Sequence, residues 1–256
     1  NIEKLIRDEK PDIAHIGLLH RQITFSVVDI LKKYNIPVVM HLHELTAVCP
    51  CYTMLRQDGT ICSDCATNGY WNCVKNKCMK GSLAKSVLAY TEAQFLKYGH
   101  YYDKIDLYIA ECNFYKTLVE KAHFTHSPII KMNNFLPINQ EYKAYYEHDN
   151  YILYFGRYAR EKGVLTILKA YAKMHCDEKL VLVGKGSEEE RIKKFVKEYN
   201  LEDRVQVNGA IFGEKMDRII ERAKVVLVPS EWYENCPFSV MESLMYGTPV
   251  LGADIG

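Results

Sequence analysis

The stretch AKVVLVPSEWYENCPFSVMESLMYGTPVLGADIG, residues 223–256, decides the fold class of the chain. Its run Val225–Val228 is too short for a helix and rich in β-branched residues, which predicts a buried strand. Pro237 suits the first turn of the helix that we expect next, and Gly247 suits the left-handed residue beyond that helix. Thr248–Leu251 predicts a second strand. A strand, a helix and a strand in this order predict a parallel pair with a right-handed crossover, and therefore an α/β fold.

Two carboxylates bracket the turn of this unit. Glu234 lies in the loop before the helix, and Glu242 lies within the helix among apolar neighbours. A carboxylate is costly to bury unless another group binds it, and open α/β sheets bind ligands at this edge, where helix amino termini collect anions. We expect both glutamates to accept hydrogen bonds from ligand hydroxyls, while the backbone of Cys236, Pro237 and Phe238 faces phosphate or sugar. The alternative is a capping glutamate and a helix-surface glutamate without a ligand.

Glu234 and Glu242, with seven residues between them and SLMYGTPVLGADIG after them, resemble the E-x7-E signature of retaining GT-B glycosyltransferases of family 4, within glycosyl transferases group 1. This resemblance implies that Glu242 holds the nucleotide ribose and that Glu234 contacts the donor sugar. The segment YFGRYAREKGV resembles the Gly-Arg…Glu-Lys-Gly element of that family, in which Arg157 and Lys162 would clamp the donor pyrophosphate. Two fixed cations can stabilise a departing diphosphate without a metal. The alternative is a surface arginine and a lysine at the start of a helix, which we expect to run from Glu161 to about Met174.

Residues 151–256 predict a C-terminal nucleotide-sugar-binding Rossmann-like domain that is truncated. The predicted strand Lys179–Val183 ends in a loop that contains Gly184. Acidic residues at the following helix start would repel a phosphate directly above them, so we expect this loop beside the nucleoside. The resemblance implies that the loop after the next strand touches the base through its backbone; its residues are Gly209, Ala210 and Ile211.

Residues 1–136 predict a partial N-terminal Rossmann-like domain on the acceptor side, and residues 137–150 predict a linker. The order PDIAHI, helix, NIPVVMHLHE resembles the second half of the N-terminal domain of the family. The glycine-rich acceptor-side loop of that domain is not found. The chain also begins within a helix-like segment and stops directly after Gly256, so we expect it to be truncated at both ends.

A histidine follows the predicted strand Val38–Leu42 at its ligand-binding end. The resemblance implies a histidine near the donor sugar at this position, and His43 with Glu44 matches its His-acid pair best. His41 is the competing choice, because it lies two residues earlier on the same face of the strand. The alternative for either residue is a hydrogen-bonded structural histidine.

Residues 49–81 form a Cys-rich insert with little apolar content. A C-x2-C pair lies between two cysteines, each separated from it by twelve intervening residues, and this spacing can close a tetrahedral thiolate site for a structural zinc ion. The predicted ligands are Cys49, Cys62, Cys65 and Cys78. Cys51 or Cys73 could replace one of them, and free thiols or disulfides are the alternatives. Four thiolates leave no open position, so we expect no catalytic metal.

Composition excludes several classes of function. The net charge of +1 gives no indication of nucleic-acid binding, and the apolar and charged fractions of 48% and 25% are ordinary. Neither a membrane-spanning run nor a secretory signal is found, so we expect a cytoplasmic protein. A basic run precedes an expected helix with apolar residues: Lys75, Lys77, Lys80 and Lys85, then Leu83, Val87, Leu88, Phe95 and Leu96. One interpretation is a surface that meets anionic lipid or a lipid-pyrophosphate acceptor, which implies peripheral membrane contact. The alternative is a solvated lysine face on a helix whose apolar residues pack in the core.

These patterns together predict an enzyme with two Rossmann-like domains and a cleft between them. The implied reaction transfers a hexose from a nucleoside diphosphate sugar to a glycan or lipid-linked acceptor with retention, in cell-surface polysaccharide synthesis. The resemblance implies front-face displacement, with His43 and Glu234 stabilising the positive charge that develops on the sugar. The alternatives are a GT-B nucleotide-sugar epimerase or synthase, and a non-catalytic, zinc-stapled nucleotide-binding scaffold.

Overall fold

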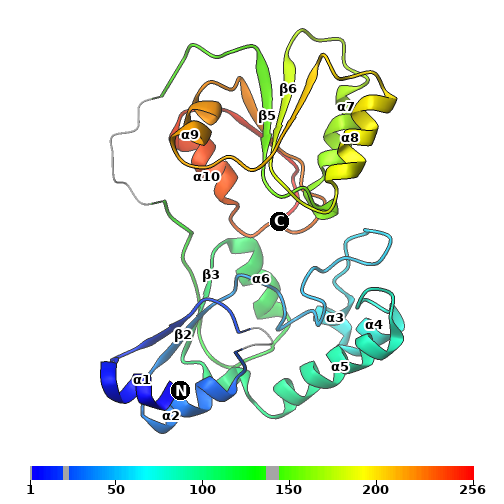
Figure 1. Ribbon diagram of the computed structural model, residues 1–256. Coiled ribbons are helices and arrows are strands. Elements are labelled where there is room, and N and C mark those ends of the chain that lie inside the picture. Colours follow the sequence, from blue (N-terminus) through cyan, green and yellow to red (C-terminus); the bar gives the residue numbers. More distant parts are fainter. Residues whose placement is uncertain (1, 20–22, 137–143) are drawn as a thin grey trace. The chain divides into compact units, whose positions relative to one another are not determined.

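The computed structural model describes residues 2–19, 23–136 and 144–256, and it divides into two compact units (Figure 1). Unit 1 comprises Asn1–Asn133 and unit 2 comprises Asn134–Ile255. Each unit contains one parallel sheet with its own helices, so the predicted α/β fold is confirmed. Of the predicted linker, residues 137–143 lie outside the described residues.

Unit 1 has a four-stranded sheet in the order β1-β2-β3-β4, and every neighbouring pair is parallel. Its strands are β1 (Ala14–Ile16), β2 (Val38–His41), β3 (Leu107–Ala110) and β4 (Ile129–Lys131). Its longer helices are α1 (Ile2–Glu9), α2 (Ser26–Lys33), α5 (Leu83–Tyr98) and α6 (Asn113–Lys121), with a 3-10 turn at Tyr102–Lys104. Because all strands run in one direction, the residues that follow β2 and β3 meet at one edge of the sheet.

Unit 2 has a five-stranded parallel sheet in the order β7-β6-β5-β8-β9. Its strands are β5 (Tyr151–Phe155), β6 (Lys179–Val183), β7 (Val205–Asn208), β8 (Val225–Val228) and β9 (Val250–Gly252). Its helices are α7 (Val164–Tyr171), α8 (Glu189–Glu198), α9 (Glu214–Glu221) and α10 (Phe238–Met245). The chain runs outward from β5 to β7 and then returns to β8 on the other side of β5. The strand order therefore reverses between β5 and β8, and this is where such sheets bind ligands.

The core of unit 2 lies on both faces of its sheet. Leu180 and Leu182 of β6 belong to the cluster that contains residues of α7 and α8, whereas Val181 and Val183 belong to the cluster that contains residues of α9. This alternation follows from the two-residue period of a strand. Figure 1 shows α7 and α8 on one side of the sheet and α9 and α10 on the other. Burial on both faces explains why the strands are continuous apolar runs.

Two predicted helix boundaries were wrong, each because of local backbone geometry. Pro237 is the N-cap of α10 with an extended backbone (ψ 124°), so the helix begins one residue later than predicted. The helix predicted from Glu161 is instead a 3-10 turn, Arg160–Lys162, followed by α7. Gly163 separates the two with a left-handed backbone (φ 68°) that interrupts a right-handed helix.

The Cys-rich insert contains two short helices, α3 (Asp64–Asn68) and α4 (Trp71–Lys75), and α5 follows it. Of the two alternatives for this helix, core packing of its large apolar residues holds only for the half-buried Leu96. The helix packs instead through small residues, Ser86, Ala89 and Ala93, and the exposed side chains include Leu83, Val87, Leu88 and Phe95. Small side chains let the backbone of α5 approach its neighbours closely. Nowhere in the described part of the chain is a helix long and apolar enough to cross a bilayer.

We expect Gly184→Ala to lower the free energy of unfolding by about 2 kcal/mol or more, because overpacking against backbone cannot relax easily. A Cβ atom on Gly184 would lie 1.9 Å from the carbonyl oxygen of Gly156, whereas one on Gly209 would meet only the Lys185 side chain, at 3.4 Å. Gly209→Ala is therefore the matched control, with a change of about 0.5 kcal/mol or less. Urea denaturation measures both changes, and equal stabilities of the two variants would contradict the packing argument.

Candidate active site

The loops that follow β5 and β8 are held together at the point where the strand order of unit 2 reverses. The Glu231 amide donates a hydrogen bond to the Glu161 carbonyl at 2.8 Å, and the Thr166 hydroxyl bonds to the Glu231 carboxylate. Gly163 lies against the backbone of Pro229, since a Cβ atom there would be 2.1 Å from the Pro229 carbonyl oxygen. These contacts fix the distance between the two loops.

Lys162 and Glu234 form an ion pair across these loops. The Lys162 Nζ atom lies 2.6 Å from Glu234 Oε1, and both side chains are largely buried. The same carboxylate oxygen accepts hydrogen bonds from the Ser230 hydroxyl and, at 3.0 Å, from Trp232 Nε1. The Lys162 ammonium also lies over the Trp232 ring, 5.1 Å from its centroid. One carboxylate oxygen therefore organises a lysine, a serine and a tryptophan.

Burial and pairing with Lys162 shift the pKa of Glu234 in opposite directions. Burial favours the neutral acid, but the nearby Lys162 charge and the three hydrogen bonds favour the carboxylate, and together they hold the pKa of Glu234 below its usual value. Glu234 is thus an ionised group in a partly desolvated site. A charge of this kind can bind hydroxyl donors or oppose a positive charge that forms beside it.

Arg157 and Glu242, the other two predicted donor ligands, have different surroundings. Arg157 follows β5, is 65% exposed, and reaches Glu161 Oε1 at 3.5 Å. Glu242 lies in α10 and is half-buried, with no hydrogen bond or ion pair to any residue that the structure describes. Burial raises the pKa of Glu242, and the nearby Asp217 adds to this effect. The structure therefore brings Lys162 and Glu234 into contact and leaves Arg157 and Glu242 on the flanking elements.

The remaining predicted donor residues of unit 2 also lie at or beyond the carboxyl ends of its strands. Gly184 directly follows β6, and Gly209, Ala210 and Ile211 follow β7. Tyr158 ties the loops of these strands together, because its hydroxyl donates to the Asn208 carbonyl at 2.8 Å and its amide donates to the Lys185 carbonyl at 2.9 Å. Cys236, Pro237 and Phe238 form the start of α10, where the Cys236 carbonyl accepts a bond from Asn134 Nδ2 at 3.3 Å.

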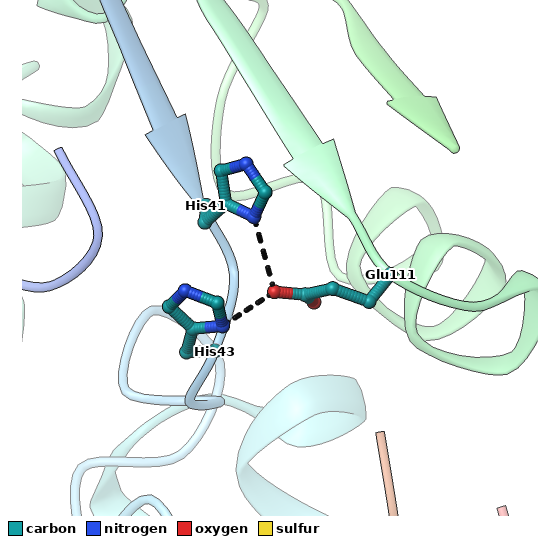
Figure 2. A group of neighbouring side chains, drawn as sticks. All are labelled: His41, His43 and Glu111. Carbon is teal, nitrogen blue, oxygen red and sulfur yellow. Dashed lines mark hydrogen bonds and ion pairs between the residues drawn. The ribbon is translucent and has the colours of Figure 1, made fainter. Parts of the chain in front are cut away.

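In unit 1, the two candidate histidines converge on one buried carboxylate. Glu111 directly follows β3 and is fully buried, and its Oε1 atom lies 2.6 Å from Nδ1 of His43 and 3.3 Å from Nδ1 of His41 (Figure 2). The two rings stack with centroids 5.0 Å apart. The His43 side chain is 45% exposed and that of His41 is 12% exposed, so His43 is the one that a ligand can reach.

The acid that contacts His43 is Glu111 rather than its sequence neighbour Glu44. Nε2 of His41 is buried without a hydrogen-bond partner in the described part of the chain. Ligand atoms of His41, His43 and Glu111 all lie within 4.8 Å of one another, so this group has the composition of a cation site. Its carboxylate oxygen already contacts both Nδ1 atoms, and that arrangement equally fixes the orientation of the rings.

Sequence reasoning missed Glu111, Ser230 and Trp232. Glu111 could have been found, because it follows a strand that neighbours β2 in a parallel sheet, and such strand ends share an edge. Ser230 and Trp232 lie within the stretch that was singled out, but no pattern indicates that their side chains turn back toward Glu234.

Comparisons with known proteins show first the fold and then the family to which the C-terminal part of the chain is similar. Sucrose-phosphate synthase from Thermosynechococcus elongatus is similar over 99% of this chain and 59% of its own, with a TM-score of 0.68 and 18% identity. HepE of Anabaena, solved in complex with UDP and glucose, is similar over 100% of this chain and 63% of its own, with a TM-score of 0.65 and 16% identity. These similarities define the class as α/β proteins with the GT-B fold.

Residues 138–256 match the family model described as glycosyl transferases group 1. The alpha-D-kanosaminyltransferase of Streptomyces kanamyceticus is 29% identical over 107 residues, which are 41% of this chain and 28% of that protein. The match and the relatives support the glycosyl transferases group 1 family for this chain. The chain spans less than a third of the length of the first curated relatives that it matches.

We expect Glu234→Gln to lower the free energy of unfolding by about 1–3 kcal/mol at neutral pH, because the change leaves Lys162 partly buried without its counter-charge. The folded-state pKa of Glu234 is depressed, so its ionised form stabilises the protein above the pKa of an unfolded glutamate, about 4.3. This contribution is lost as the pH falls through the lower folded-state pKa. The difference between wild type and variant should therefore shrink in acid.

Urea denaturation of both proteins over a pH series measures this difference. The matched control is Glu198→Gln, because Glu198 is exposed on α8. A difference between wild type and Glu234→Gln that does not change with pH would mean that the charge of Glu234 is irrelevant to stability.

Proposed function

We propose that the chain is part of a retaining glycosyltransferase of family 4 that transfers a hexose from a nucleoside diphosphate sugar to a glycan or lipid-linked acceptor. The observation that carries the proposal is the Lys162–Glu234 pair at the point where the strand order of unit 2 reverses. A fixed cation at this position suits the diphosphate of such a donor, and an ionised carboxylate suits the hydroxyl groups of its sugar. The UDP and glucose named for the HepE complex, and the transferase names of the relatives, support the same substrate class.

Lys162 and Arg157 bind the donor diphosphate in this proposal. Both follow β5, and both side chains carry a positive charge in the free protein. When the bond between the sugar and the diphosphate breaks, negative charge accumulates on the departing phosphate, and fixed cations stabilise that charge. The start of α10 adds backbone amides and the positive end of a helix dipole. We therefore assign no catalytic metal to the reaction.

Glu234 and Glu242 bind the hydroxyl groups of the donor. Glu242 is half-buried and makes no hydrogen bond or ion pair with the described residues, so hydroxyls of a ribose would supply the donors that its carboxylate needs. Glu234 is ionised and faces the sugar, where it opposes the positive charge that develops at the anomeric carbon. Retention follows if the departing phosphate itself removes the proton from the acceptor on the same face of the sugar.

We propose in addition that His43 provides a polar contact to the donor sugar. Its Nδ1 atom is held by Glu111 at 2.6 Å, which directs the other ring nitrogen away from that carboxylate. A histidine that is fixed in this way loses little freedom when the substrate binds. Glu111 acts through His43 and is a positioning residue.

The exposed face of α5 supports a lipid-linked acceptor in cell-surface polysaccharide synthesis. Leu88 and Phe95 are 69% and 63% exposed on this helix. Four exposed lysines lie beside them or shortly before the helix: Lys75, Lys77, Lys80 and Lys85. Apolar side chains next to lysines suit an anionic membrane surface, where a lipid pyrophosphate would be presented.

We expect Arg157→Ala to lower kcat/KM for sugar transfer about 100-fold in the complete enzyme, because it removes one of two charges that stabilise the leaving diphosphate. Glu242→Gln should weaken donor binding roughly 10- to 100-fold, the effect of losing a hydrogen bond to a charged group. Transfer assays and calorimetric titration with a panel of UDP-, GDP- and ADP-sugars measure both effects. The control is Arg191→Ala, because Arg191 pairs with Glu188 on α8.

Unchanged transfer in both variants would remove these assignments. Product analysis tests the reaction type as well. An epimerised sugar in the absence of acceptor, or donor binding without any turnover, would contradict the glycosyltransferase and favour the epimerase or the scaffold.

We expect Glu111→Gln to slow transfer roughly tenfold, because a charge-assisted hydrogen bond to His43 becomes a neutral one. If Glu111 acts through His43, the double variant with His43→Ala should be no slower than His43→Ala alone. The matched control is Glu120→Gln, which changes a surface carboxylate on α6. Additive losses in the double variant would show that Glu111 does not act through the histidine.

A further inference from the structure

All six cysteines of the insert line one small cavity: Cys49, Cys51, Cys62, Cys65, Cys73 and Cys78. Four of them are buried, and the structure records all of them as free thiols. The cavity lies between the loop that begins at Cys49 and the helix α4. The convergence of six thiols within one small region of unit 1 requires a physical reason, because three cysteines lie elsewhere in the chain without such grouping: Cys112, Cys176 and Cys236.

Four of the six sulfur atoms are neighbours in a continuous series. Cys49 Sγ lies 3.4 Å from Cys51 Sγ, and the Cys78 thiol lies beside the thiols of Cys51 and Cys73 in the lining of the same cavity. Two ligands thus come from a C-x-C turn, one from α4 and one from the turn that follows α4. In a tetrahedral zinc site with Zn–S bonds of about 2.3 Å, the sulfurs are about 3.8 Å apart. The observed separation is close to that value and far longer than the ~2.05 Å of a disulfide.

The other two cysteines face different partners. The Cys62 thiol lies beside the Arg56 and Asp64 side chains, which pair with each other at 2.9 Å. The Cys65 thiol faces the Tyr70 carbonyl, at 3.9 Å. The set expected from sequence spacing, with Cys62 and Cys65 as ligands, therefore differs from the set that the sulfur contacts indicate.

The turn that carries Cys49 and Cys51 has a costly backbone. Tyr52 and Met54 adopt left-handed conformations, with φ of 58° and 50°. Left-handed geometry is unfavourable for residues other than glycine. The Thr53 amide donates to the Cys51 carbonyl at 2.8 Å and closes this turn. The loop therefore accepts backbone strain and places the two sulfur atoms 3.4 Å apart.

The insert has little else to hold it together. Its helices α3 and α4 have five residues each, and its one described β-bridge joins Leu55 and Ile61. The local core consists of Cys65, Tyr70 and Cys73, with two alanines of α5. A segment with so small an apolar core needs a cross-link or a metal ion to define its structure.

We propose that Cys49, Cys51, Cys73 and Cys78 bind one structural zinc ion. The ion links the C-x-C turn to α4 and to the turn that follows α4. In the described residues, only His41, His43 and Glu111 bring three ligand atoms all within 4.8 Å of one another. The four sulfurs therefore form a series of neighbouring pairs rather than a closed tetrahedron, and the outer thiols move inward when the ion binds. The four thiolates fill the coordination sphere of zinc, so the site is structural and independent of sugar transfer.

The test measures metal and thiols rather than activity. Protein purified under reducing conditions should contain about one zinc ion per chain by elemental analysis, and X-ray absorption should show four sulfur neighbours at ~2.3 Å. Alkylation followed by mass spectrometry should label Cys62 in the zinc-loaded protein and protect the four ligands. Removal of zinc with a strong chelator should expose those four to labelling.

Variants then separate the two ligand sets. Cys51→Ser and Cys73→Ser should each lose stoichiometric zinc, whereas Cys62→Ser and the control Cys176→Ser should keep it. Zinc loss in Cys62→Ser but not in Cys51→Ser, fewer than four sulfur neighbours, a disulfide among the four, or metal-free protein with an unchanged fold would each overturn the proposal. The alkylation experiment uses the unmutated protein, so it decides the outcome even if a variant fails to fold.

Discussion

The ion pair between Lys162 and Glu234 is the interaction on which the candidate site of unit 2 depends. It joins the loop after β5 to the loop after β8, and the strand order of the sheet reverses between these two strands. The topology brings the loops to one edge, and close packing of Gly163 against Pro229 sets their separation. The ion pair, with Ser230 and Trp232 on the same carboxylate oxygen, then fixes the side chains. A substitution at either charged residue would therefore change the geometry of the whole edge.

In unit 1, as in unit 2, a carboxylate at the edge of a parallel sheet holds basic side chains in place. Its sheet is also parallel, and the residues that follow β2 and β3 meet at one edge. Glu111 is fully buried there, and its contact with His41 and His43 compensates its desolvation. In both units a carboxylate at a strand end holds a basic side chain in place. The GT-B fold supplies the shared edge, and individual residues supply the chemistry.

Much of the fold could be predicted from the sequence, because buried parallel strands are short apolar runs. Lys179–Val183 and Val225–Val228 were predicted with the bounds that the structure has. The boundaries of α7 could not be predicted, since they depend on the left-handed Gly163. For α5 the sequence left two alternatives open, a lipid-facing surface and a core-packed helix, because helical spacing identifies a face but does not show whether another element covers it.

The site was only partly predictable for a related reason. The glutamates of unit 2 belong to a recognisable motif, whereas Glu111 is a single acid whose role depends on which strand lies beside which. Likewise, the spacing of cysteines shows which residues can reach a common point, but it does not show which way each sulfur turns. Cys62 fits the spacing and yet faces Arg56 and Asp64.

The pairing of Lys162 with Glu234 has a consequence for the release of a nucleotide product in the proposed reaction. A diphosphate that draws Lys162 away would deprive Glu234 of its counter-charge, and hydroxyls of an attached sugar would restore its hydrogen bonds. In the proposed reaction, a nucleoside diphosphate left after sugar transfer would hold Lys162 while Glu234 stayed partly buried without its counter-charge. Re-forming the internal pair would then compete with the spent nucleotide and favour its release.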